Sequence, residues 1–153
     1  MPSCTFYYGD TMPIREHLLP EVMFRKPVIK NVDRNGDGKI DGYQFQLGNP
    51  YYTANPISSI SDFILDVDGE AVPLEKITFI LRGQEIDAKK AYTFYDVSWG
   101  FADVMEIFVE KSGGLRKGNH EVSLLLKMRE TIHYGYPDGK VPFQAKRTMN
   151  VTV

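Results

Sequence analysis

Short runs of alternating apolar and polar residues, each closed by a turn signal, recur along this chain of 153 residues. Residues 43–47 alternate Tyr, Phe and Leu with two Gln, and residues 122–128 place Val, Leu, Leu and Met on one face. Such a period of two is typical of half-buried strands. No stretch has a convincing helical period, and Pro20 limits residues 14–22 to one short helical turn.

Short strands and frequent turns predict an all-β fold in a single domain. We expect a two-sheet antiparallel β-sandwich of roughly seven or eight strands, with Ig-like and jelly-roll topologies both open. The length suits one domain, in which residues 1–19 are an N-terminal extension and residues 20–153 form the sandwich.

Two local expectations concern the middle of the chain. Residues 63–67 and 77–81 are expected to pair as strands, with the turn at Asp68 and Gly69, because Asp-Gly favours tight hairpins. The less regular residues 82–103 are expected to form one long loop.

Composition excludes several classes of partner. The net charge is −2 and Lys and Arg are scattered, so we expect no nucleic-acid partner. No apolar run approaches the length of about 18 residues that a membrane helix needs, and the start of the chain has no signal-peptide pattern. We therefore expect a cytoplasmic protein with no membrane partner. Cys4 is the only cysteine, so an internal disulfide is excluded, and we assign Cys4 no role.

The stretch "NVDRNGDGKIDGYQ", residues 31–44, is similar to a calcium loop. Asp33, Asn35, Asp37 and Asp41 would stand at ligand positions, but Gln44 replaces the carboxylate that should bind the ion with both oxygens. Both flanks have strand patterns instead of helical ones. We therefore expect a tight hairpin and no metal site, and keep a weak, non-helical calcium loop as the alternative.

No catalytic constellation is evident in the sequence, and we nominate no catalytic residue. His17, His120 and His133 are far apart and fit no metal-binding motif; each is expected at the surface or in a turn, with His133 of most interest because a tyrosine-rich loop follows it. No pair of carboxylates, nucleophile motif or phosphate-binding loop can be assigned.

The remaining signal is aromatic. Tyr51 and Tyr52 follow Pro50 in a polar, turn-rich stretch, and Trp99 lies in "DVSWGF". Large rings displayed on loops serve both protein interfaces and sugar-binding platforms. We take Tyr51, Tyr52 and Trp99 as candidate subunit-interface residues, with core packing as the alternative.

The order of three segments carries a resemblance to a known family. The segments are "GYQFQLGNPYY", "VDGEAVP" and "GGLRKGNHEV". From about residue 24 to residue 153 the chain resembles the small β subunit of bacterial C-glycoside deglycosidases. The N-terminal extension has no recognised counterpart, and the acidic loop is fuller than the family pattern requires.

The resemblance implies a hetero-oligomeric carbon–carbon lyase. A larger TIM-barrel subunit would bind a divalent metal, expected to be manganese, and perform the acid–base chemistry, while this chain holds no cofactor. The substrate implied is a 3-oxo C-glycoside whose sugar is joined to an aromatic aglycone such as a flavonoid. Two other interpretations stay open. One is a free-standing carbohydrate-binding module that stacks Tyr51, Tyr52 and Trp99 on sugars and binds calcium in its loop; the other is a self-sufficient lyase.

Overall fold

Strands dominate the computed structural model, which describes residues 19–51, 53–101, 103–129 and 135–152, so the predicted all-β class is confirmed. The elements are α1 (Leu19–Met23), β1 (Val28–Val32), β2 (Gly42–Gly48), β3 (Asn55–Pro56), η3 (Ile57–Ser59), β4 (Ile60–Val67), β5 (Glu70–Ala71), η4 (Leu74–Lys76), β6 (Ile77–Leu81), β7 (Gln84–Asp87), η5 (Ala88–Thr93), β8 (Ser98–Trp99), β9 (Val104–Glu110), β10 (Gly118–Arg129) and β11 (Lys140–Val151). The only α-helix in these described ranges is one short turn, as expected.

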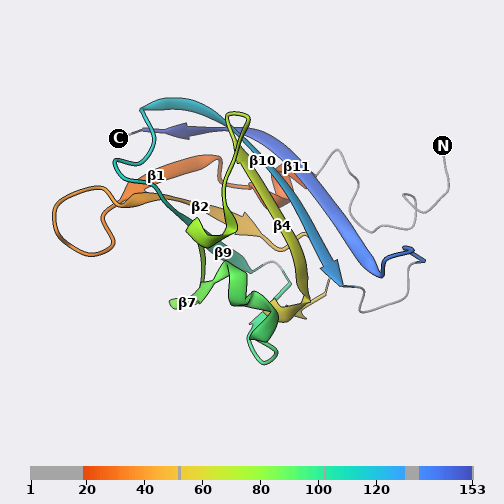
Figure 1. Cartoon of the computed structure of the whole chain (residues 1–153). Helices are drawn as coiled ribbons and strands as arrows, with labels where there is room; N and C mark the ends of the chain where they lie inside the picture. Colours follow the sequence, from red (N-terminus) through yellow and green to blue (C-terminus); the bar gives the residue numbers. More distant parts are fainter. Residues whose placement is uncertain (1–18, 52, 102, 130–134, 153) are drawn as a thin grey trace.

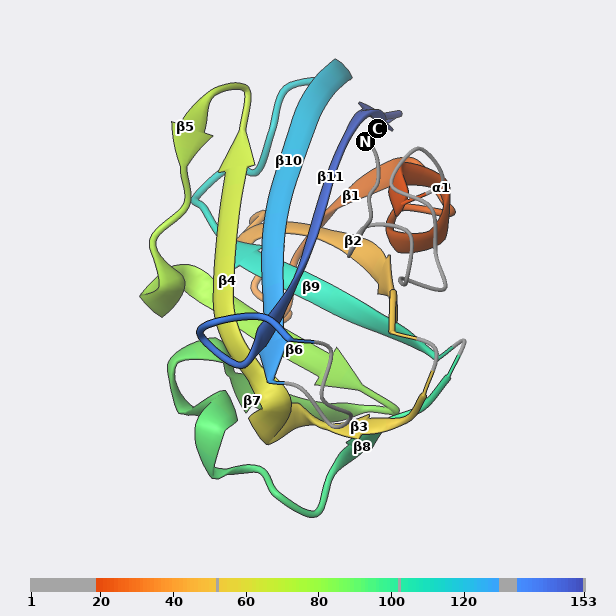
Figure 2. The same ribbon diagram turned by 90° about the vertical axis from the view of Figure 1, so that its right-hand side faces the viewer.

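One large curled sheet supplies both layers of the fold. Its nine strands follow the order β5-β4-β10-β11-β1-β2-β9-β6-β7, and β3 and β8 form a separate two-stranded sheet. Strand β1 joins the layers, because Val28 and Ile29 pair in parallel with β11 whereas residues 30–32 pair antiparallel with β2. Figure 2 shows β4, β10 and β11 crossing in front of β2, β9 and β6, and Figure 1 shows the same curl from the side.

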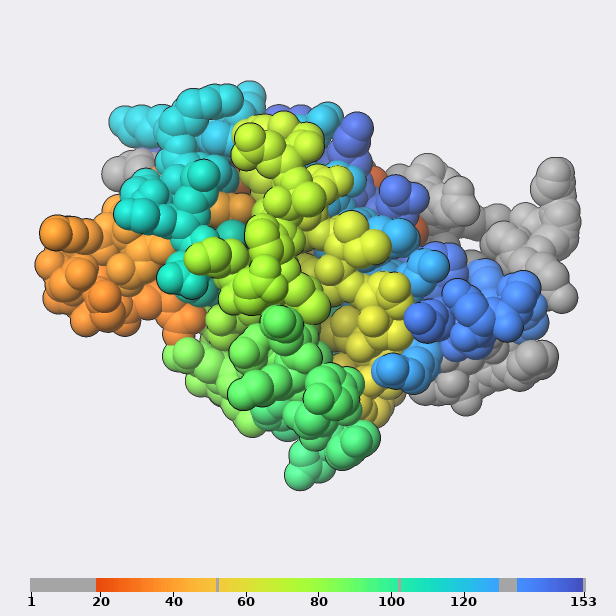
Figure 3. Space-filling model, in the orientation of Figure 1, coloured from red at the N-terminus to blue at the C-terminus, as the bar shows by residue number. Residues whose placement is uncertain are grey.

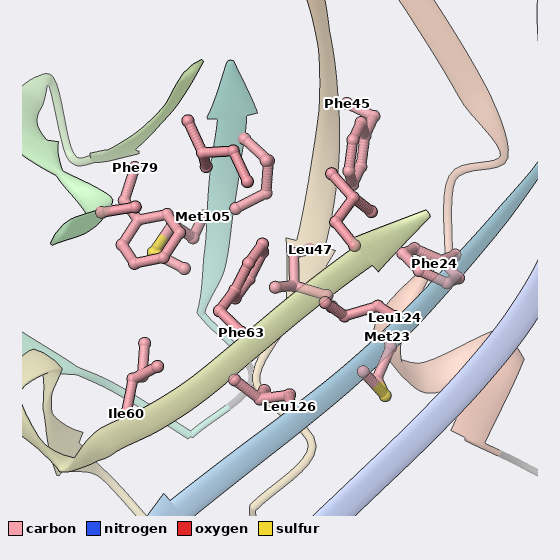
Figure 4. Close-up of a cluster of buried hydrophobic side chains, with 14 of the residues drawn as sticks. Met23, Phe24, Phe45, Leu47, Ile60, Phe63, Phe79, Met105, Leu124 and Leu126 are labelled. Carbon is pink, nitrogen blue, oxygen red and sulfur yellow. The ribbon is translucent and has the colours of Figure 1, made fainter. Parts of the chain in front are cut away.

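The core lies between these layers. The inward side chains of β10, which are Val122, Leu124, Leu126 and Met128, are fully buried, as the alternation predicts. The rings of Phe63 on β4 and Phe79 on β6 lie 4.9 Å apart between centroids. Figure 4 shows side chains of both layers meeting there.

The helix α1 closes one edge of the core. Met23 and Phe24 are fully buried, and the ring of Phe24 meets the edge of Phe45 at 6.0 Å. Gly48 permits this approach, because a Cβ there would lie only 2.4 Å from the Val22 carbonyl oxygen.

The expected pairing of residues 63–67 with 77–81 is wrong, although the turn itself is present. Asp68 and Gly69 have φ of 53° and 82°, as the hairpin turn with two positive φ values requires, but this turn joins β4 to the two-residue β5. Pro73, which has no N–H for a ladder, then follows, and the chain crosses to the other layer. There β6 pairs with β7 and β9.

One other expectation needs correction. Residues 82–103 are not one loop, since they contain β7, η5 and β8.

Strand β11 begins at Lys140, so Pro142 lies inside a strand. Only β10 pairs with that part of β11, so the other edge of β11 is unpaired there and the missing N–H of Pro142 is tolerated. The expected N-terminal extension lies outside the described residues, apart from Leu19. No helix in the described part of the chain has the length and apolarity needed to cross a membrane.

Candidate functional site

The acidic hairpin, residues 33–41, connects β1 to β2 and projects from the molecule as the orange lobe in Figure 3. Its flanks are strands, as expected. Carboxylate oxygens of Asp33, Asp37 and Asp41 lie within 4.8 Å of one another. The loop therefore gathers three acidic groups on an exposed turn.

Backbone amides of the same hairpin already donate to these side chains. The bonds run from Gly36 and Gly38 to Asp33 (2.9 and 2.7 Å), from Arg34 and Asn35 to Asp41 (2.6 and 3.1 Å), from Asp37 to Asn35 (3.1 Å) and from Lys39 to Asp37 (2.8 Å). This is the local bonding by which Asp and Asn stabilise turns. The predicted hairpin is present, but its loop of nine residues between the paired Val32 and Gly42 is longer than the tight turn expected. The calcium alternative stays a prediction to be tested by titration.

Two of the three candidate interface rings are core side chains. Trp99 is fully buried and its Nε1 donates to the Asp103 carbonyl at 3.2 Å. Tyr51 is 1% exposed, and its ring lies 5.6 Å from that of Phe143. The expectation that these rings are displayed on loops is wrong for both, because Trp99 lies in β8 and the Tyr51 ring packs against Phe143 in the core. Neither can stack on a sugar in this conformation, and Tyr52 lies outside the described residues.

The exposed rings lie instead on what we call the aromatic segment, residues 88–101. Tyr92, Tyr95 and Phe101 are 61%, 74% and 65% exposed. The segment runs from η5 to just beyond β8, and its green part projects at the lower end of the molecule in Figures 1 and 3.

The backbone of the aromatic segment is firmly held. Asn49 is buried, and its Nδ2 donates to the carbonyls of Trp99 and Gly100, each at 3.1 Å. Arg82 donates to the Ser98 carbonyl at 2.6 Å and pairs with Asp103 at 2.7 Å. At the start of η5, the Asp87 side chain accepts a hydrogen bond from the backbone amide of Lys89 and so caps the helix. These contacts hold the backbone of the segment, while the rings of Tyr92, Tyr95 and Phe101 are exposed.

A cavity of about 250 Å³ opens between the β4–β5 turn and the end of β9. Tyr43, Asp68, Lys76 and Glu110 are among its lining residues, and Lys76 Nζ lies 3.8 Å from Glu110 Oε1. Burial raises the pKa of the Tyr43 hydroxyl, and the negative charge of Asp68 raises it further. At neutral pH Tyr43 is therefore a neutral phenol that can donate a hydrogen bond but cannot act as a base.

Asp68 is engaged by a buried histidine. His120 is 3% exposed; its Nδ1 lies 2.6 Å from Asp68 Oδ2 and its Nε2 lies 2.8 Å from the Arg116 carbonyl. Each ring nitrogen of His120 thus lies within hydrogen-bond distance of an oxygen. The His120 ring and the Glu121 amide hold the pKa of the Asp68 carboxyl below its usual value. The expectation that His120 lies at the surface is wrong, and His17 and His133 lie outside the described residues.

These groups are not arranged for acid–base catalysis. A general base needs a pKa near the working pH, whereas Tyr43 is held neutral and Asp68 is held ionised. The carboxylates of the acidic hairpin are bonded to their own loop. What the described residues do present is three exposed aromatic rings, those of Tyr92, Tyr95 and Phe101.

Comparisons with known proteins identify the family. The family model for the C-glycoside deglycosidase beta subunit matches residues 19–134, which is more than half of the chain. A C-glycoside deglycosidase beta subunit from Eubacterium cellulosolvens is 31% identical over 101 residues, covering 63% of this chain and 69% of the relative. This chain belongs to the C-glycoside deglycosidase beta subunit family. The resemblance seen in the sequence is confirmed, and the name beta subunit implies a partner subunit in an enzyme complex.

The region matched to the beta subunit family extends from α1 through β10, so it includes both the acidic hairpin and the aromatic segment. Of the three rings nominated from the sequence, only Trp99 lies in the aromatic segment, and it is buried; the exposed rings of that segment were not nominated. The available signal was the crowding of Tyr92, Tyr95, Trp99 and Phe101 into ten residues of irregular pattern, since one small core cannot take them all. No sequence signal marked the Asp68–His120 pair, whose members are 52 residues apart.

Proposed function

We propose that this chain is the non-catalytic beta subunit of a heteromeric C-glycoside deglycosidase. Its partner is a larger TIM-barrel subunit that carries the acid–base residues, and the complex works in the cytoplasm. Membership of the beta subunit family carries this proposal. The neutral phenol of Tyr43 and the hydrogen-bonded carboxylate of Asp68, both at the cavity described above, give it further support.

The reaction proposed is cleavage of the carbon–carbon bond between a 3-oxo sugar and an aromatic aglycone. The 3-oxo group acidifies the proton on C2, so a base of the larger subunit can remove it. A double bond then forms between C1 and C2 as the bond from C1 to the aglycone breaks, and the aglycone carbon takes a proton. A divalent metal, expected to be manganese, would supply Lewis-acid polarisation of the 3-oxo group in the larger subunit.

The residues of this chain do not fit that catalytic metal. Asp33, Asp37 and Asp41 form the one cluster of potential ligands found among the described residues. They project on a surface hairpin, and their oxygens accept amides of that hairpin. We assign no step of the reaction to them. The contribution of this chain is to bind the larger subunit and stabilise its active form.

Reconstitution tests the proposal. Each purified chain and their mixture are assayed for release of the aglycone from a 3-oxo C-glycoside. We expect no activity from this chain alone and activity from the mixture. A chelator should abolish the activity of the mixture while the melting temperature of the isolated beta subunit stays unchanged. Turnover by the pure beta subunit, or a mixture no more active than the larger subunit alone, would contradict the proposal.

A further inference from the structure

The exposed hydrophobic side chains of the described residues are unevenly distributed. Five large ones are exposed, and three of them, Tyr92, Tyr95 and Phe101, belong to the aromatic segment. The other two, Ile40 and Ile64, stand singly on the acidic hairpin and on β4. Single exposed hydrophobic residues are normal at protein surfaces, whereas a concentration of rings marks a binding surface.

The aromatic segment is also held in place before any partner arrives. Ala91 and Trp99 of the segment are buried, and the amides of Ile57 and Ser58 donate to the carbonyls of Val97 and Phe94 at 2.8 and 3.1 Å. A ring displayed on a fixed backbone loses little conformational freedom on binding, which favours affinity. The segment thus combines large contact area with a low entropic cost of association.

We propose that the aromatic segment is the surface through which this beta subunit binds the larger subunit, with the exposed rings of Tyr92 and Tyr95 as the principal contacts. The inference rests on the proposed function, because the occupant is the partner that a beta subunit requires. Aromatic side chains are enriched at the centre of protein interfaces, and a polar rim surrounds them. Exposed Lys90 and Asp96 provide that rim with both signs of charge.

The complementary surface has a defined chemistry. It presents apolar pockets that accept the two tyrosine rings, bordered by groups that hydrogen-bond the phenol oxygens. A surface of large net charge would not suit this segment, because either Lys90 or Asp96 would be repelled by it. The larger subunit should therefore display a mostly neutral, apolar patch.

The test compares the affinity of beta subunit variants for the purified larger subunit by calorimetry. The double variant Tyr92→Ala, Tyr95→Ala is expected to raise Kd at least about thirtyfold, the effect of losing a binding hot spot. Tyr95→Asp, which places a charge in the same position, should weaken binding to a similar degree. Ile64→Ala removes an exposed apolar side chain elsewhere and should leave Kd unchanged. Circular dichroism and melting temperature check that every variant is folded.

The outcomes separate this inference from the proposed function. A wild-type chain that binds the larger subunit while the folded double variant binds equally well overturns the inference alone. A wild-type chain that shows no binding and no effect on activity overturns the proposed function. If the variants instead change self-association of this chain, measured by sedimentation, with Kd for the larger subunit unchanged, the segment serves a second copy and the inference is wrong.

Discussion

The acidic hairpin and the aromatic segment both project from the sandwich, but they differ in where along the chain their hydrogen-bond partners lie. In the hairpin the carboxylates of Asp33 and Asp41 accept amides from residues at most seven positions away, so the motif is complete by itself. In the aromatic segment the groups that hold the backbone come from distant parts of the chain, and the rings of Tyr92 and Tyr95 remain exposed. We therefore propose that the second region binds the partner subunit and that the first does not.

The largest effect we expect is a difference in stability between variants at a buried ring and at an exposed ring of the aromatic segment. Trp99→Ala removes a fully buried side chain and should lower the free energy of unfolding by about 3–5 kcal/mol, as large-to-small core substitutions do. Phe101→Ala, two residues away but 65% exposed, should change it by no more than about 0.5 kcal/mol. Urea denaturation measures both. Equal losses from the two variants would show that the ring of Phe101 is buried in solution as well.

An intermediate effect is expected at the Asp68–His120 pair beside the cavity, in which His120 is buried and the Asp68 side chain is 42% exposed. Asp68→Asn keeps a side chain that tolerates the positive φ of this turn but replaces the charged acceptor of His120 with a neutral one. The cost at neutral pH should be about 1 kcal/mol, the difference between charged and neutral hydrogen bonds.

This loss should depend on pH in a definite direction. The folded-state pKa of Asp68 lies below its unfolded value of about 3.9, so the wild type holds the full stabilisation above about pH 5 and loses it as the pH falls through the folded value. The amide of the Asp68→Asn variant does not titrate. The stability gap between wild type and variant should therefore narrow below about pH 4, as measured by denaturation over a pH series. A gap that stays constant down to about pH 2 would contradict the assigned hydrogen bonds from His120 and the Glu121 amide to the Asp68 carboxylate.

The smallest effect concerns the acidic hairpin. Calcium should leave the melting temperature of the wild type unchanged, because local amides already satisfy the loop carboxylates. The variant Asp33→Asn, Asp37→Asn should be equally indifferent to calcium and to a chelator. A shift with calcium in the wild type that the variant lacks would show a real site, since a ligand that binds only the folded state stabilises it.

Features set by neighbouring residues could be predicted from the sequence. The alternation of apolar and polar residues in β10 predicted which of its faces is buried, and the Asp68-Gly69 pair predicted a tight turn. The presence of the acidic hairpin was predicted for the same reason, because its bonds join residues close in the chain. Chemistry that the chain completes locally can be inferred without knowing the rest of the fold.

Features set by distant neighbours could not be predicted. The turn after β4 does not reveal that β6 will pair with β9 in the other layer. That arrangement includes a contact across the core between Phe79 on β6 and Phe63 on β4. The burial of Trp99 depends on β8 pairing with β3, from another part of the chain. Which rings of a crowded aromatic stretch are exposed is therefore decided by tertiary packing.

Backbone hydrogen–deuterium exchange tests the contrast between the two regions most directly. The beta subunit is measured alone and in complex with the larger subunit, and protection is compared for peptides that cover residues 33–41 and 88–101. We expect slower exchange in residues 88–101 on binding and unchanged exchange in residues 33–41. Protection of the acidic hairpin with unchanged exchange in the aromatic segment would contradict this account of the interface.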